Sequence, residues 1–270
     1  MKYLWMVTLL ATVACSSQKK EVEESLPQNI DAAVASETCT PENRLRDVYR
    51  HPAETLKFSG VEPGMTVVEI APGSGWYMEI LAPLLTEKGM YIMAAPPAVK
   101  DYAIANDKKI SDWKMRNPKV ASKMKAVMFN PPSDIRFPDP GTADMVLTFR
   151  NVHNWVTAKG EKQAFKAFYD VLKPGGILGV VEHRAAPNAR DPEAKTGYMK
   201  EKDVIAMAQK AGFKLVDKSE INANPKDTKN HPEGVWTLPP ALRLGDKDKA
   251  KYLAIGESDR MTLKFEKPKK

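Results

Sequence analysis

Residues 66–85 read TVVEIAPGSGWYMEILAPLL, and this stretch decides the fold class. Its first five residues form an apolar, β-branched run that predicts a buried strand, and its last ten have the spacing of a helix with an apolar face. Pro72, Gly73 and Gly75 lie in the turn between them. A strand that turns in this way into a helix leaves free backbone amides at the carboxyl edge of a sheet, where ligands of open α/β sheets bind. The stretch therefore predicts an α/β domain with a ligand cradle at its first turn.

Strand-like and helix-like patterns alternate through the rest of the chain. Further strands are predicted at 90–95, 126–130, 143–150, 177–183, 214–222 and 259–267. Helices are predicted within 41–60, 76–89, 99–125, 160–172 and 200–212, the third broken near Pro118. Strands separated by helices predict parallel βαβ units, and hence a doubly wound, mostly parallel sheet in a single domain over residues 41–270.

The N-terminus has a different composition from the rest of the chain. Residues 1–15, MKYLWMVTLLATVAC, hold one lysine, an apolar run too short to span a membrane and small residues before Cys15, as in a secretory signal. TVAC resembles the lipobox of bacterial lipoproteins, whose cysteine carries a lipid. A plain cleaved peptide with an incidental cysteine is the alternative. We expect an exported, membrane-anchored lipoprotein facing the periplasm or the cell exterior, with residues 16–40 as a polar, flexible tether.

Composition narrows the function. The chain has 270 residues, 43% apolar, and a net charge of +7 that is scattered and forms no basic block interleaved with aromatic residues. This pattern indicates a solvated surface, so no nucleic-acid partner is expected. With Cys15 lipidated, only Cys39 remains and no intramolecular disulfide forms. The four histidines lie far apart in the sequence without paired ligand spacing, so no metal site is predicted.

The motifs resemble those of a known family. VVEIAPGSG resembles the first motif of class I S-adenosylmethionine-dependent methyltransferases, and FPDPGTADMVLTFRNVHNW and AFKAFYDVLKPGGILGVVEH also sit where that family has its fourth and fifth strands. GWYMEILAP, VHNW and GESDRMTLKF resemble a group of predicted methyltransferases with export signals. The resemblance implies a seven-stranded sheet with an antiparallel last strand, S-adenosylmethionine as the cofactor, and a small-molecule acceptor.

The resemblance also implies the cofactor-binding residues, which are Glu69, Ala71, Pro72, Gly73, Ser74, Gly75 and Asn130. The second strand ends in Ala-Ala-Pro-Pro where the family has an acid for the ribose, which leaves Asp101 or nothing for that role. Pro131 stands at the adenine-binding acid, with Asn130 or Asp134 as substitutes. An acid that accepts two hydroxyl bonds contributes on the order of 2–3 kcal/mol, so its loss weakens affinity about a hundredfold. A non-catalytic binding module that kept the fold is therefore the alternative function.

The sequence FRNVHNW after the fourth strand carries the catalytic prediction. Methyl transfer to oxygen or nitrogen requires removal of a proton, and His153 is able to act as that base near neutral pH, with Asn154 beside it. A capping or core histidine is the alternative. Glu182 and His183 end the fifth strand on opposite faces by strand alternation, and either one near His153 makes an acid/base pair. The predicted catalytic residues are His153, Asn154 and Glu182.

Residues 223–258, between the last two strands, are longer than a hairpin needs. Trp236 and Tyr252 indicate that this insertion is folded. We expect either a lid or wall of the acceptor pocket, or a cover over an apolar face.

Overall fold

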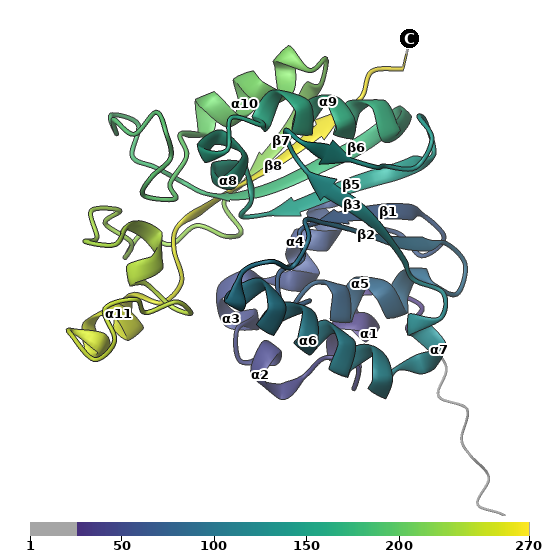
Figure 1. Cartoon of the computed structure of the whole chain (residues 1–270), viewed down its shortest axis with the longest axis horizontal. Helices are drawn as coiled ribbons and strands as arrows, with labels where there is room; N and C mark the ends of the chain where they lie inside the picture. The colour runs from purple at the N-terminus through teal and green to yellow at the C-terminus, as the bar shows by residue number, and fades with distance from the viewer. Residues whose placement is uncertain (1–25, 270) are drawn as a thin grey trace, which may run out of the picture.

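The computed structural model describes residues 26–269, so the predicted signal segment with Cys15 lies outside the described residues. An eight-stranded sheet in the order β4-β3-β2-β1-β5-β6-β8-β7 forms its centre (Figure 1). The strands are β1 (Thr66–Ile70), β2 (Met90–Ala95), β3 (Lys125–Asn130), β4 (Asp134–Ile135), β5 (Ala143–Phe149), β6 (Leu172–His183), β7 (Lys214–Ser219) and β8 (Arg260–Glu266). From β3 to β6 the neighbours are parallel, whereas β8 runs antiparallel to both β6 and β7.

The doubly wound sheet with an antiparallel last strand is confirmed. The seven predicted strands are all present, and β4 adds a two-residue antiparallel pairing with β3. Two residues are too few to show a period of alternation, so the sequence pattern did not indicate β4.

Helices cover both faces of the sheet (Figure 1). One layer holds α1 (Ile30–Ala35), α2 (Pro41–Arg44), α3 (Asp47–Arg50), α4 (Pro52–Ser59), α5 (Met78–Leu85), α6 (Asp101–Arg116) and α7 (Pro118–Ala121), and the other holds α8 (Val152–Thr157), α9 (Glu161–Val171) and α10 (Glu201–Lys210). Alternation along β1 sends Val67 to the core of the first layer and Val68 to that of the second. Because both faces are buried, the central strands read as continuous apolar runs.

The folded part begins earlier than the predicted boundary at residue 40. Ile30 and Ala33 of α1 and the side chain of Cys39 are buried in the core of the first layer, and the indole nitrogen of Trp113 donates to the carbonyl oxygen of Thr38 at 2.7 Å. The average composition of this segment is polar, but its few apolar residues share one helical face. Burial raises the pKa of the Cys39 thiol to about 12, which keeps it protonated.

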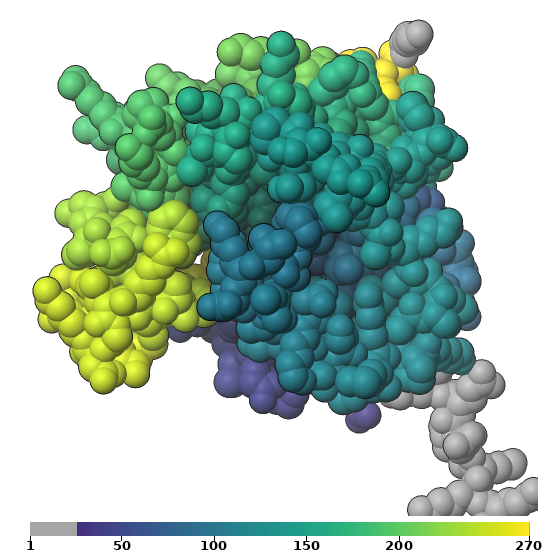
Figure 2. Space-filling view, viewed as in Figure 1, coloured from purple at the N-terminus to yellow at the C-terminus, as the bar shows by residue number. Residues whose placement is uncertain are grey.

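The insertion between β7 and β8 holds a short 3-10 helix, η1 (Gly234–Thr237), and α11 (Lys249–Ile255). Val235, Leu238 and Tyr252 are buried in it. Figure 2 shows it as a lobe beside the helical layer, drawn in yellow-green and yellow. Among residues 26–269, no helix has the length and apolar character that crossing a membrane requires.

Candidate active site

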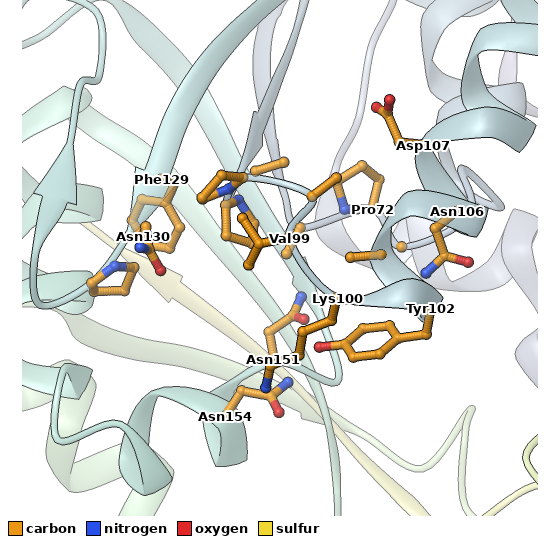
Figure 3. A pocket seen from close by; sticks show the side chains of 18 of the residues that line it. Pro72, Val99, Lys100, Tyr102, Asn106, Asp107, Phe129, Asn130, Asn151 and Asn154 are labelled. Carbon is orange, nitrogen blue, oxygen red and sulfur yellow. The ribbon is translucent and has the colours of Figure 1, made fainter.

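A cavity of about 530 Å³ opens at the carboxyl edge of the sheet (Figure 3). Its walls come from the segments that follow four parallel strands: Ala71 to Gly73 after β1, Ala95 to Lys100 after β2, Asn130 and Pro131 after β3, and Asn151 and Asn154 after β5. The volume lies within the range of small-molecule and cofactor sites. Five of the predicted site residues therefore line one cavity: Ala71, Pro72, Gly73, Asn130 and Asn154.

The turn after β1 has the backbone conformation of a ligand cradle. Ala71, Gly73 and Gly75 have φ values of 45°, 62° and 88°. A Cβ atom added to Gly73 meets nothing within 4 Å, whereas one added to Gly75 lies 2.8 Å from the Cε atom of Met78. Gly73 thus borders open space, whereas Gly75 lies in packed structure; neither Gly75 nor Ser74 lines the cavity. Ala71 takes a conformation that costs a non-glycine residue about 1 kcal/mol, so the turn holds local strain.

Glu69 lies beneath the cradle and does not line the cavity. It shares the face of β1 that packs on α5, and its Oε2 atom accepts a hydrogen bond from the hydroxyl of Tyr91 at 2.7 Å. Burial raises the pKa of Glu69 to about 7, although the Tyr91 hydrogen bond acts in the opposite direction. The motif implies that Glu69 contacts the cofactor. In this structure the Glu69 carboxylate does not point into the cavity, because strand alternation turns it toward α5.

Helix α6 supplies a wall that the sequence analysis missed. Lys100, Tyr102, Asn106 and Asp107 line the cavity, and Figure 3 shows the Tyr102 hydroxyl directed toward Asn151 and Asn154. The two acids considered from sequence lie elsewhere: Asp101 is exposed outside the lining, and Asp134 is paired with Arg136 at 2.8 Å.

The available signal was the helical spacing of Ala103, Asn106, Asp107 and Ile110, which places them on one face. The spacing does not indicate which part of the protein this helix face packs against. The polar side chains on this part of the cavity wall thus come from α6 and not from the end of β2.

A second group of polar side chains lies where β6 ends and α8 begins. The Nδ1 atom of His153 is 3.1 Å from Oε1 of Glu182, and the rings of His153 and His183 are 5.4 Å apart. The predicted pair of His153 with Glu182 is therefore present. His153 is 4% exposed, and its ring lies 5.8 Å from that of Trp236 in the insertion. It faces the insertion and does not line the cavity, so the insertion forms a wall beside it.

Glu182 is a buried anchor for the start of α8. Its two carboxylate oxygens accept hydrogen bonds from the backbone amides of Val152, His153 and His183 at 2.5, 3.3 and 2.8 Å. Its exposure is 0%. With its oxygens occupied in this way, Glu182 holds and orients His153 and does not face a substrate.

His153, Glu182 and His183 offer ligand atoms within 4.8 Å of one another, close enough for one metal ion. Burial lowers the pKa of His183 well below its usual value, and the electrostatic interactions with His153 and Arg150 lower it further. The same positive surroundings oppose a bound cation, and three backbone amides already use the Glu182 oxygens. The expectation of no metal stays a prediction.

Comparison with known proteins supports the fold assignment. No protein-family model matches the chain. It is 34% identical over 128 residues to the ubiquinone/menaquinone biosynthesis C-methyltransferase UbiE of Citrobacter koseri, and this stretch covers 47% of the chain and 46% of that relative. The chain thus spans about half the length of the curated relatives it matches.

Solved structures match over most of the chain. A SAM-dependent methyltransferase from Aquifex aeolicus is similar with a TM-score of 0.54 and 17% identity, over 85% of this chain and 94% of that one. The [4+2]-cyclase SpnF also has a TM-score of 0.54, with 15% identity over 88% and 92% of the two chains. The strand order, the cavity at the carboxyl edge and these similarities together show that the chain has the fold of the class I S-adenosylmethionine-dependent methyltransferases.

Proposed function

We propose that this chain is an S-adenosylmethionine-dependent methyltransferase that acts on a small molecule outside the inner membrane. The observation that carries the proposal is the cavity at the carboxyl edge of β1, β2, β3 and β5, with Gly73 bordering open space. The similarity to the UbiE C-methyltransferases is consistent with this reading.

The residues that line the cavity fit the cofactor. The loop around Gly73 lets a ligand come against the backbone, and Asn130 offers both a donor and an acceptor for a heterocyclic base. Asn106 and Asp107 are the polar groups for ribose hydroxyls. When bound, S-adenosylmethionine supplies an electrophilic methyl group on a sulfonium sulfur.

Residues around α8 prepare the acceptor. With Nδ1 of His153 3.1 Å from Glu182, Nε2 is the ring atom left to take a proton; because His153 is buried outside the cavity lining, it serves as the base for an acceptor that reaches from the cavity toward the insertion. The buried carboxylate of Glu182 stabilises the imidazolium that forms. Asn151 and Asn154 on the cavity wall orient the acceptor. Removal of a proton from an enol or phenol raises the nucleophilicity of its oxygen and its ring carbon alike, so the same base serves O- and C-methylation.

We place the protein on the outer side of a membrane, held by a lipid on Cys15. The short apolar run of residues 1–15 and the sequence TVAC support this address.

The second candidate is a binding module that kept the fold without methyl transfer. It is favoured by Ala95, Pro96 and Pro97 at the end of β2, which bring no acid to the cavity. The SpnF structure, described as a cyclase, also has this fold, so the fold does not by itself imply methyl transfer.

Calorimetry separates the two candidates. S-adenosylmethionine and S-adenosylhomocysteine are titrated into the chain that lacks residues 1–15, and into the same chain with Gly73→Val as the matched control. The enzyme is supported if the unsubstituted chain binds these ligands with dissociation constants in the micromolar range and the Gly73→Val control does not bind them. No binding at millimolar ligand refutes it and supports the module. A screen of phenols, amines and thiols with labelled methyl donor then identifies the acceptor.

A further inference from the structure

Three arginines share one buried carboxylate beside the candidate active site. Glu257, at the end of the insertion, accepts from Nε of Arg46 at 2.7 Å, from Nε of Arg50 at 3.1 Å and from Nη1 of Arg260 at 3.2 Å. Arg50 is 3% exposed, Arg260 2% and Glu257 4%. Burial by itself raises the pKa of Glu257, but the charges of Arg50, Arg260 and Arg46 prevail and lower it to about 2. The carboxylate is ionised at any physiological pH, and its one negative charge is shared by three positively charged arginines.

A fourth arginine, half-buried Arg150, follows the end of β5, and its charge acts on the other three. Burial lowers the pKa of Arg50 well below its usual value, and the next cause is the charge of Arg150, which also acts on Arg46 and Arg260. Within residues 26–269, no hydrogen bond or ion pair is made by the Arg150 side chain, and none reaches the two terminal nitrogens of Arg50. We call Arg46, Arg50, Arg150 and Arg260 the arginine cluster.

The backbone of Arg150 is held in an unusual conformation. Its φ value is 62°, and its amide donates to the carbonyl oxygen of Val181 at 2.7 Å. A non-glycine residue in the left-handed region is uncommon, and such conformations cluster at functional sites. This backbone conformation carries a guanidinium that has no hydrogen-bond or ion-pair partner within residues 26–269.

The charges do not balance. Arg46, Arg50 and Arg260 share the single carboxylate of Glu257, and the charge of Arg150 acts on all three, so positive charge is in excess. Nearby acids offset only part of the excess: half-buried Asp47 acts on both Arg44 and Arg50, Glu69 bonds to Tyr91 and has a pKa raised to about 7 by burial, and Asp259 is paired with Arg184 and Lys229. Buried charges are normally paired, and the buried guanidiniums of Arg50 and Arg260 share one carboxylate, so this excess of positive charge favours the binding of an anion.

The arginine cluster adjoins the cavity without lining it. The guanidinium of Arg50 lies 4.6 Å from the ring centroid of Trp76, at the end of the loop whose start lines the cavity. Arg150 directly precedes Asn151, a residue of the cavity wall. Figure 2 shows a furrow between the insertion, which supplies Glu257, and the helical layer, which supplies Arg50. Through Asn151, which follows Arg150 in the chain, the cluster is connected to the cavity wall, and we place an anion at the cluster beside a molecule bound in the cavity.

We propose that the arginine cluster binds an anionic group, a carboxylate or a phosphate, on the methyl acceptor. This inference rests on the proposed function, since it assigns a substrate class to the same site. Guanidinium groups bind both kinds of oxyanion through paired hydrogen bonds. S-adenosylmethionine is not the missing anion, because its sulfonium and ammonium charges outnumber its one carboxylate and leave it a cation. An anionic acceptor compensates both the cluster and the cofactor.

The test uses the full chain and Arg150→Gln, with Arg136→Gln as the matched control. Arg136 is exposed and paired locally with Asp134, so its loss removes one arginine without touching the cluster. The melting temperature is measured against sodium phosphate and, separately, sodium malonate, at an ionic strength kept constant with sodium chloride. The stronger of the two anions identifies the acceptor group as phosphate or carboxylate.

We expect saturable stabilisation of the wild type and of Arg136→Gln by one or both anions. Arg150→Gln should melt at a higher temperature than the wild type without anion, because repulsion among the arginines falls. Its anion affinity should be weaker by roughly tenfold or more, the effect of one charge-assisted hydrogen bond. Arg150→Lys keeps the positive charge but loses the planar guanidinium that donates two parallel hydrogen bonds, and should bind the anion with intermediate affinity.

Several results overturn the inference. Equal anion effects in all variants show that surface cations bind the anion, and a lower melting temperature of Arg150→Gln without anion shows a structural role. A tenfold loss of S-adenosylmethionine affinity in Arg150→Gln, measured by calorimetry, assigns the cluster to the cofactor carboxylate. If the wild type binds the anion through the cluster but no S-adenosylmethionine, the proposed function fails and the link to methyl transfer fails with it, while the anion site itself stands.

Discussion

Glu257→Gln removes the one negative charge that Arg46, Arg50 and Arg260 share, and should lower the free energy of unfolding at pH 7 by roughly 3 kcal/mol. The magnitude comes from the shift of the Glu257 pKa from 4.5 to about 2. It agrees with the loss of several kcal/mol that follows when one partner of a buried ion pair is removed. Glutamine keeps the size of the side chain, but it replaces one accepting oxygen by an amide nitrogen that donates, so the change removes the charge together with the acceptor for part of the arginine hydrogen bonds.

The effect should depend on pH in a direction that follows from the shift. A carboxylate whose pKa is lower in the folded than in the unfolded state stabilises the protein fully above the unfolded value, here 4.5. That stability is lost as the pH falls toward about 2, the folded value. Urea unfolding followed by circular dichroism at pH 7, 5, 4 and 3 should show the gap between wild type and variant shrinking by about 1.4 kcal/mol per pH unit below the unfolded pKa.

Glu220→Gln is the matched control, because Glu220 also pairs with an arginine, Arg184 at 2.6 Å, but is 69% exposed. An exposed pair contributes about 1 kcal/mol or less. Phosphate should restore more stability to Glu257→Gln than to the wild type, since the variant leaves the arginine cluster more positive. The reasoning is refuted if Glu257→Gln is as stable as the control variant, or if the gap stays constant from pH 7 to pH 3.

Three further predictions concern the site and the address. Gly73→Val should abolish S-adenosylmethionine binding while urea unfolding stays cooperative, since valine resists a φ of 62° and its side chain enters the cavity; unchanged affinity would remove the cradle assignment. His153→Ala should cut turnover by about 100-fold or more with cofactor affinity within a few-fold, and a joint fall of melting temperature, affinity and turnover would instead indicate a structural histidine. Cys15→Ser should move the protein from the membrane to a soluble extracytoplasmic fraction, and an unprocessed cytosolic product would contradict the lipoprotein prediction.

The sequence by itself determined the order and type of the elements. Local patterns carry this information: the β-branched run at 66–70 and the apolar helix spacing of 78–85 are set by each residue's neighbours along the chain. The turn at Pro72 and Gly73 was predicted for the same reason, because positive φ is a local demand that glycine meets. With the elements in this order, the rules for parallel crossovers leave few topologies, and the doubly wound sheet is among them.

Only the tertiary structure decided which side chains meet at the site. Residues 26–40 looked like tether by composition, but Ile30 and Cys39 pack on helices that come later in the chain. The face of α6 that carries Asn106 and Asp107 is visible in the sequence, whereas its position over the end of β2 is not.

The arginine cluster shows the same division most clearly. By sequence, Arg150 is a candidate substrate-facing residue in FRNVHNW, whereas Arg50 and Arg260 are not distinguished, and each lies about a hundred positions from Arg150. They become a charged group because α3, the end of β5 and the start of β8 reach the same edge of the sheet. The periodicity of a sequence indicates whether a side chain points into the protein. Which other charged side chains lie beside it depends on the order in which the strands pair.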